Sequence, residues 1–270
     1  MATRAMAPTA TISAPSSAGP PTIRIAGTKV HLTDARGACD AIADTVHDHS
    51  RAPLAVTSVN LDHVHHAASH VVGAGHGIRH LNLIDGAPIA SQVRRLTGAD
   101  WPRLSGNDLI GDILRRANSE RWRVAVVGGS PATRESLHRR VVAQWPGVSL
   151  IGHWTPNRAE VASSAASAAI AEKISHTDAD LVIVCMGKPL QEDWIDAYGE
   201  ATGARVLLAF DAVVDFLAGR VSRAPRWVAR TRFVKMWRLM LEPRRLAKRY
   251  LVEGPPAYLA VRRSSGHQEA

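Results

Sequence analysis

The strongest constraint on the fold is an alternation of short apolar segments with longer amphipathic ones. The short segments are rich in Val, Leu and Ile without polar alternation, which is typical of parallel strands covered by helices on both faces. We expect strands at Leu54–Val59, His80–Ile84, Arg123–Val127, Val148–Ile151, Leu181–Met186 and Arg205–Phe210. We expect helices at Asp34–Ser50, Leu61–Val72, Asn107–Ser119, Ala132–Gln144, Arg158–His176 and Gln191–Ala201. This order indicates an α/β fold with a mostly parallel sheet and helices on both of its faces.

Two terminal segments fall outside this alternation. Residues 1–22 are rich in Ala, Pro, Ser and Thr and lack the continuous apolar run of a secretory signal, so we expect a disordered leader. The alternation ends near Gly219, after which basic and aromatic residues are interleaved at helical spacing. We therefore expect an α/β domain over 23–219 and a basic helical appendage over 220–270.

The net charge of +9 is concentrated in that appendage. Residues 223–263 hold 12 Arg or Lys and two acids, whereas the rest of the chain holds 21 basic and 22 acidic residues. Large apolar residues among the cations favour an anionic membrane surface. A nucleic acid would attract the same cations, and a solvated face packed on the domain is the third interpretation.

The remaining composition fits a cytoplasmic protein bound peripherally to the inner face of the membrane. No apolar stretch reaches the roughly 18 residues that a membrane span needs. The spacing of the two cysteines, Cys39 and Cys185, suggests neither a disulfide framework nor a zinc site. The sequence leaves the oligomeric state open, with a homo-oligomer as one expectation.

Asp85 is the first candidate for chemistry, because it follows an expected strand and precedes Gly86. Ligands of open α/β sheets bind outside the carboxyl ends of the strands, where a carboxylate can act on a substrate. The alternative is that Asp85 caps the next helix.

Two glycine turns follow later strands. Gly128 and Gly129 precede an expected helix whose N-terminal N–H groups could bind phosphate, although a simple tight turn explains them equally. Gly187 lies in the second turn, before Gln191 and Glu192. Gln191 could bind a sugar or phosphate, whereas Glu192 could be only a favourable first-turn acid.

Three further polar residues, Ser58, Asn60 and Arg103, lie near the end of an expected strand or before an expected helix. Ser58 and Asn60 suit hydroxyl recognition, although Asn60 could simply cap a helix. Arg103 precedes a further helix, and its guanidinium could pair with a diphosphate or remain solvated. Histidines at 63, 66 and 70 share a helix face without an evident metal-ligand partner, so we expect no metal site there.

In this order the motifs resemble those of the WecG/TagA/CpsF glycosyltransferase family, from about Ile23 to Leu251. The resemblance rests on short segments that are each weak and together specific. They are Asn60-Leu61-Asp62-His63, Ile84-Asp85-Gly86, Gly187-Lys188-Pro189-Leu190-Gln191-Glu192, Asp215-Phe216-Leu217-Ala218-Gly219, Arg223-Ala224-Pro225, Glu242-Pro243-Arg244-Arg245-Leu246 and Arg249-Tyr250-Leu251.

The resemblance implies a Rossmann-like domain that transfers a sugar with inversion, without a cofactor or metal. The donor would be a UDP-sugar of the N-acetylmannosamine or hexose type, and the acceptor a polyprenyl-diphosphate-linked saccharide of cell-wall polymer or exopolysaccharide synthesis. Asp85 would be the general base. Substrate would be bound by Ser58, Asn60, Arg103, Gln191, Arg238 and Arg245, and the nucleotide by Gly128, Gly129, Gly187 and Asp215.

The chain departs from the family pattern at several positions. Ser58 stands where the family usually has Thr, and Leu190 where it usually has Lys. Asp211 replaces a Gly close to the expected nucleotide site. We interpret the chain as a divergent member with a different sugar.

Two other classes of function compete with this interpretation. A non-catalytic phosphate-binding α/β protein could use the basic appendage to engage nucleic acid. The large apolar residues of the appendage favour a membrane instead, so we expect no nucleic-acid partner. A nicotinamide-dependent oxidoreductase is disfavoured, because the chain lacks the GxGxxG dinucleotide motif after a strand.

Overall fold

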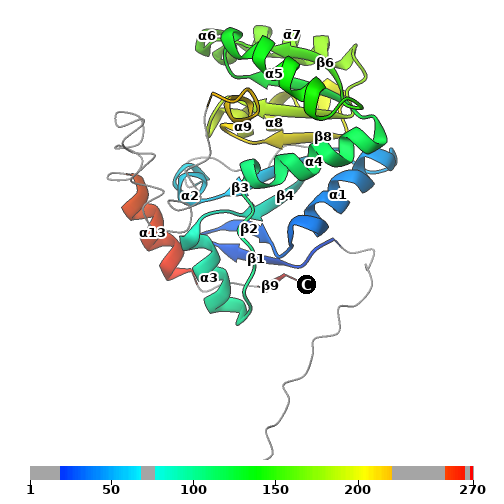
Figure 1. Cartoon of the computed structure of the whole chain (residues 1–270). Coiled ribbons are helices and arrows are strands. Elements are labelled where there is room, and N and C mark those ends of the chain that lie inside the picture. Colours follow the sequence, from blue (N-terminus) through cyan, green and yellow to red (C-terminus); the bar gives the residue numbers. More distant parts are fainter. Residues whose placement is uncertain (1–18, 68–76, 221–252, 265–267, 270) are drawn as a thin grey trace, which may run out of the picture.

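The computed structural model describes residues 19–67, 77–220, 253–264, 268 and 269. Its centre is a six-stranded sheet in which every neighbouring pair of strands is parallel (Figure 1). The strand order is β4-β3-β8-β7-β5-β6. The strands are β3 (Leu54–Val59), β4 (Arg79–Ile84), β5 (Arg123–Gly128), β6 (Ser149–Trp154), β7 (Leu181–Cys185) and β8 (Val206–Ala209). The expected α/β fold with a mostly parallel sheet is confirmed.

Helices cover both faces of this sheet, because the strand residues are apolar on both sides. One core cluster joins the sheet to α1 (Ala35–His47), α4 (Gly106–Glu120), α5 (Pro131–Gln144) and α9 (Val213–Leu217). The other joins the opposite face to α7 (Ser164–Ser175) and α8 (Leu190–Tyr198). All residues of β3, β7 and β8 are buried, as expected for strands enclosed on two faces.

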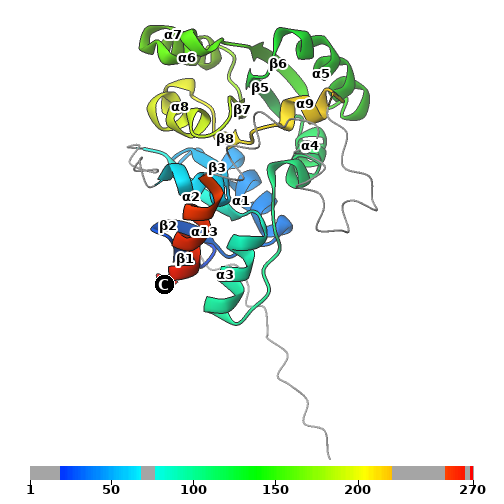
Figure 2. The same ribbon diagram turned by 90° about the vertical axis from the view of Figure 1, so that its left-hand side faces the viewer.

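A second, antiparallel sheet lies below the first in Figure 1 and was not expected from the sequence. Its strand order is β2-β1-β9, formed by β1 (Thr22–Ile25), β2 (Thr28–His31) and β9 (Gln268–Glu269). It packs with α2 (Leu61–Ala67), α3 (Ala87–Thr97) and α13 (Gly254–Arg263) around a third apolar cluster (Figure 2). In that cluster Ala257 and Val261 of α13 are buried, so the end of the chain is part of the packed structure.

Three elements differ from those expected. The helix expected at Arg158–His176 is two helices, α6 (Arg158–Ala162) and α7, because extended backbone at Ser163 ends one and caps the other. Helix α3 was missed. The helix expected to reach Ala201 ends at Tyr198 and is followed by a 3₁₀ turn over Glu200–Thr202.

Candidate active site

The carboxyl ends of the six parallel strands meet at one edge of the sheet, where most of the expected site residues lie. Asn60 follows β3 and Asp85 follows β4, the neighbouring strand. The Asn60 Nδ2 amide donates to Asp85 Oδ2 over 3.0 Å. The structure thus brings together two residues that are 25 positions apart in the chain.

Asn60 has two roles that we had treated as alternatives. Its Oδ1 accepts hydrogen bonds from the backbone N–H groups of Asp62 and His63, both at 3.1 Å, and so caps α2. The other end of the same amide binds Asp85. Since the cap fixes the amide oxygen, the amide nitrogen is aimed at the carboxylate.

Asp85 does not cap the helix that follows it. The N-cap of α3 is Gly86, which has φ +80° and makes no side-chain capping bond. The Asp85 side chain is left facing Asn60, and burial raises the pKa of its carboxyl. Nearby Asp108 raises this pKa further, whereas the Asn60 amide, the Lys188 ammonium and the Gly86 N–H lower it. A carboxyl with a raised pKa accepts a proton more readily, as a general base must.

Arg103 and Ser58 lie beside this pair. Ser58 is buried, and its hydroxyl donates to the carbonyl of Leu104 over 3.4 Å. The Leu104 N–H donates to the carbonyl of Ile84 over 2.6 Å, one residue before Asp85. Arg103, the residue before Leu104, is therefore held at the same edge, with its side chain exposed.

The glycine turns after β5 and β7 lie further along this edge. Gly128 and Gly129 have φ values of +105° and +74°, and the Gly129 N–H donates to the Cys185 carbonyl at the end of β7. Ser130 and Thr133 then form a capping box at the start of α5. Asp215 lies in the first turn of α9, and Arg220 donates to the Ser130 hydroxyl over 3.3 Å. These turns border one stretch of the edge, as a phosphate-binding segment would.

A buried polar cluster at the start of α8 was only partly anticipated. We define the α8 cluster as Lys188, Gln191 and Glu192, whose side chains are almost fully buried. Lys188 Nζ donates to Glu192 Oε1 over 2.5 Å, and Gln191 Nε2 donates to the same oxygen over 3.2 Å. Glu192 is therefore more than a first-turn acid. The signal in the sequence was the i, i+4 spacing of Lys188 and Glu192.

Two acceptor atoms of this cluster point to a polar ligand. Gln191 Oε1 and Glu192 Oε2 are buried and have no hydrogen-bond partner in the described part of the chain. The same holds for Nε2 of His63, whose pKa burial lowers to about 3, so that the ring is neutral. Buried acceptors without partners are costly, and saccharide hydroxyl groups would satisfy them.

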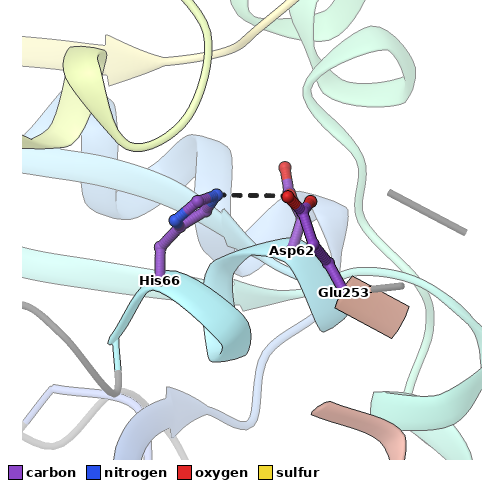
Figure 3. A group of neighbouring side chains, drawn as sticks. All are labelled: Asp62, His66 and Glu253. Carbon is purple, nitrogen blue, oxygen red and sulfur yellow. Dashed lines mark ion pairs between the residues drawn. The ribbon is translucent and has the colours of Figure 1, made fainter. Parts of the chain in front are cut away.

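The histidine-containing face of α2 carries one group that could hold a metal ion. Ligand atoms of Asp62, His66 and Glu253 all lie within 4.8 Å of one another, and His66 Nε2 is 3.6 Å from Asp62 Oδ1 (Figure 3). Asp62 and Glu253 also take part in further interactions. The His66–Asp62 pair is explained as an i, i+4 ion pair, so the group by itself does not identify a metal centre. His70 lies outside the described residues.

Two residues expected to bind the substrate lie outside the part of the chain that the structure describes. Arg238 and Arg245, expected to contact phosphates, belong to the segment 221–252.

None of the helices in the described ranges is long and apolar enough to cross a bilayer.

Residues 23–269 match the glycosyl transferase WecG/TagA/CpsF family. The chain belongs to this family. The resemblance expected from the motifs is therefore confirmed, and the match includes the C-terminal helix α13 and strand β9.

Two curated relatives carry the same name, N-acetylglucosaminyldiphosphoundecaprenol N-acetyl-beta-D-mannosaminyltransferase. The Bacillus subtilis strain 168 protein is 24% identical over 164 residues, which cover 60% of this chain and 60% of that protein. The Bacillus spizizenii strain W23 protein is 26% identical over 182 residues, which cover 66% of this chain and 63% of that protein. The similarity thus spans less than two thirds of either relative.

Proposed function

We propose that this family member is an inverting glycosyltransferase with Asp85 as its general base. It would move a sugar of the N-acetylmannosamine or hexose type from a UDP-sugar to a polyprenyl-diphosphate-linked saccharide. The carrying observation is the Asp85 carboxyl, which caps no helix, accepts a hydrogen bond from Asn60 and has a raised pKa. The names of the two relatives support a lipid-diphosphate-linked acceptor.

In this proposal the reaction is a single displacement. The Asp85 carboxylate accepts the proton of the acceptor hydroxyl while the oxygen of that hydroxyl attacks the anomeric carbon of the donor. The bond from that carbon to the UDP oxygen breaks, and UDP leaves with the electron pair. Asn60 holds the carboxylate in place, and Arg103 would stabilise the charge that develops on the phosphates.

The other substrate contacts in this proposal come from the same edge and from the basic segment. Ser58 and Gln191 would bind sugar hydroxyl groups. The turns of Gly128, Gly129 and Gly187, with Asp215, would bind the nucleotide. Arg238 and Arg245 would contact phosphates, and no metal ion is required in this mechanism.

We further propose that the basic segment holds the enzyme on the inner, anionic face of the membrane. The support is the excess of Arg and Lys over residues 223–263 and the aromatic residues among them. Cosedimentation with anionic vesicles, and its absence with neutral ones, tests this part of the proposal.

The central experiment compares the wild type with Asp85→Asn in a transfer assay. UDP-sugars are screened against a short-chain polyprenyl-diphosphate N-acetylglucosamine, and UDP release and the lipid product are measured. We expect wild-type turnover and a loss of about 10²- to 10⁴-fold in Asp85→Asn, with UDP binding retained. The matched control is Asp112→Asn, which removes an exposed carboxylate of α4 that pairs with Arg115.

Two results would contradict the proposal. Activity of Asp85→Asn close to that of the wild type would remove Asp85 as the base. A wild type that transfers no sugar and binds no UDP, but binds duplex DNA as tightly as anionic vesicles, would favour a non-catalytic phosphate- or nucleic-acid-binding protein.

A further inference from the structure

The α8 cluster lies at the carboxyl edge of the parallel sheet, the edge at which Asn60 and Asp85 also lie. Lys188 belongs to the turn that follows β7, and Gln191 and Glu192 lie in the first turn of α8. The side chains of Lys188 and Glu192 are 4% and 5% exposed, and Gln191 is completely buried. Polar groups buried this deeply are costly unless each finds a hydrogen-bond partner.

The hydrogen bonds inside the cluster fix the orientation of its groups. Lys188 Nζ and Gln191 Nε2 both donate to Glu192 Oε1, over 2.5 and 3.2 Å. An ionised carboxylate only accepts hydrogen bonds, so the Gln191 amide has to turn its NH₂ group toward Glu192 and its oxygen away. Because both donors reach the same carboxylate oxygen, Gln191 Oε1 and Glu192 Oε2 have no partner among the residues that the structure describes.

The two free atoms define the chemistry of a ligand. Two buried acceptors need hydrogen-bond donors, which the hydroxyl and acetamido N–H groups of a saccharide supply. An ionised phosphate offers only acceptor oxygens, and the Glu192 carboxylate would repel it. A lysine in a turn of this kind could otherwise bind phosphate, but the Lys188 ammonium is buried and paired with Glu192. Of the two ligands considered for Gln191, a sugar and a phosphate, the cluster therefore favours the sugar.

We propose that the α8 cluster is a saccharide subsite, in which Gln191 Oε1 and Glu192 Oε2 accept hydrogen bonds from two groups of one sugar ring. Lys188 is a positioning residue that holds the Glu192 carboxylate charged and oriented, and it contacts no phosphate. This inference rests on the proposed glycosyltransferase function, since the sugar is that of the donor or of the acceptor. It adds Glu192 to the residues that touch the substrate.

The test compares ligands that carry a sugar with counterparts that lack it, by isothermal titration calorimetry. The donor set is UDP-N-acetylmannosamine and UDP-glucose, each measured against UDP. The acceptor set is short-chain polyprenyl-diphosphate N-acetylglucosamine, measured against the same polyprenyl diphosphate. A loss of affinity in the donor set assigns the subsite to the donor sugar, and a loss in the acceptor set assigns it to the acceptor sugar.

The decisive variant is Glu192→Gln. Because Lys188 and Gln191 donate to one side of residue 192, the new amide has to place its oxygen there and turn its NH₂ group toward the ligand. We expect this variant to bind the sugar-bearing ligand of one set about 10- to 100-fold more weakly, because a bond to a charged acceptor is lost. UDP and the polyprenyl diphosphate should bind as they do to the wild type.

Two further variants keep the test interpretable. Glu135→Gln is the matched control, because Glu135 is an exposed glutamate of α5 in an i, i+4 pair with Arg139, and it should bind every ligand normally. The double variant Lys188→Met/Glu192→Gln removes both buried charges together, so it serves if Glu192→Gln does not fold. It should lose the same affinity for the sugar and keep its affinity for UDP and for the polyprenyl diphosphate.

Three results would overturn the inference. They are a wild type that gains no affinity from the sugar of either set, a Glu192→Gln variant that binds every ligand normally, and a variant that loses affinity equally for ligands with and without the sugar. The binding measurement needs no turnover, which separates this inference from the proposed function. If Glu192→Gln loses affinity only for the sugar and the wild type transfers none, the proposed function fails and the subsite stands. If sugar is transferred but Glu192→Gln binds normally, the subsite fails alone.

Discussion

Gly128→Ala is a sharp test of how the edge of the sheet is built. Gly128 ends β5, has φ +105° and pairs with Cys185 of β7. A Cβ atom at this position would lie 2.1 Å from the Cys185 carbonyl oxygen. That oxygen belongs to the backbone of a buried strand and accepts the Gly129 N–H, so it cannot move aside alone.

The expected cost adds two contributions. An L-residue with this positive φ costs about 1–3 kcal/mol. Separating the strands to relieve the clash costs at least the hydrogen bond to Cys185, about 1 kcal/mol, and some packing. We therefore expect Gly128→Ala to lower the free energy of unfolding by at least about 2–4 kcal/mol.

The same chemical change at Gly111 should act in the opposite direction. Gly111 lies inside α4, and a Cβ there would meet nothing within 4 Å. Since alanine is the better helix former, Gly111→Ala should stabilise the protein by about 0.5–1 kcal/mol. Guanidinium denaturation followed by circular dichroism measures both variants. A Gly128→Ala variant within about 1 kcal/mol of the wild type, in a measurement that resolves the Gly111→Ala gain, would refute this account of the turn.

Two further predictions concern stability. Burial raises the pKa of Asp85, so the folded state binds the carboxyl proton more tightly than the unfolded state does. Asp85 therefore stabilises the fold less as the pH rises above 3.8, the ordinary pKa of an aspartate carboxyl. Asp85→Asn should therefore be more stable than the wild type at neutral pH, by about 1.4 kcal/mol for every tenfold tighter binding of that proton in the folded state. This gain in stability should vanish at acid pH. Thermal melts from acid to neutral pH measure it, and a gain that does not depend on pH would contradict the prediction. Ser105→Ala removes the N-cap of α4, where the hydroxyl accepts from Asp108 N and donates to Asp108 Oδ2. We expect a loss of about 1 kcal/mol in the same denaturation assay, and an unchanged midpoint would show that the cap contributes nothing.

The elements that the sequence predicted well are those with a strong local cause. The six strands of the parallel sheet are largely apolar, and each was placed within three residues of its observed ends. The helix expected to begin at Asp34 is α1, and the Asp34 carboxylate caps it by accepting the Gly37 N–H over 2.8 Å. Helix α3 was missed although its buried residues Ile89 and Val93 have helical spacing.

The strands that were missed have no comparable local signal. β1 and β2 are only four residues long, and β9 only two. They exist because β1 pairs with both neighbours and contributes Ile23 and Ile25 to the third apolar cluster. Pairing between the two ends of the chain is a property of the folded molecule, so no periodicity within either segment could predict it.

The sequence by itself determined which residues stand at strand ends, because apolar runs and turn residues are local patterns. It therefore placed Asn60, Asp85 and Gln191 at one edge of the sheet. The tertiary structure decided what these residues do to one another, since charge and burial depend on neighbours from other strands. Only the fold sets the Asn60 amide on Asp85 and encloses Lys188 with Glu192.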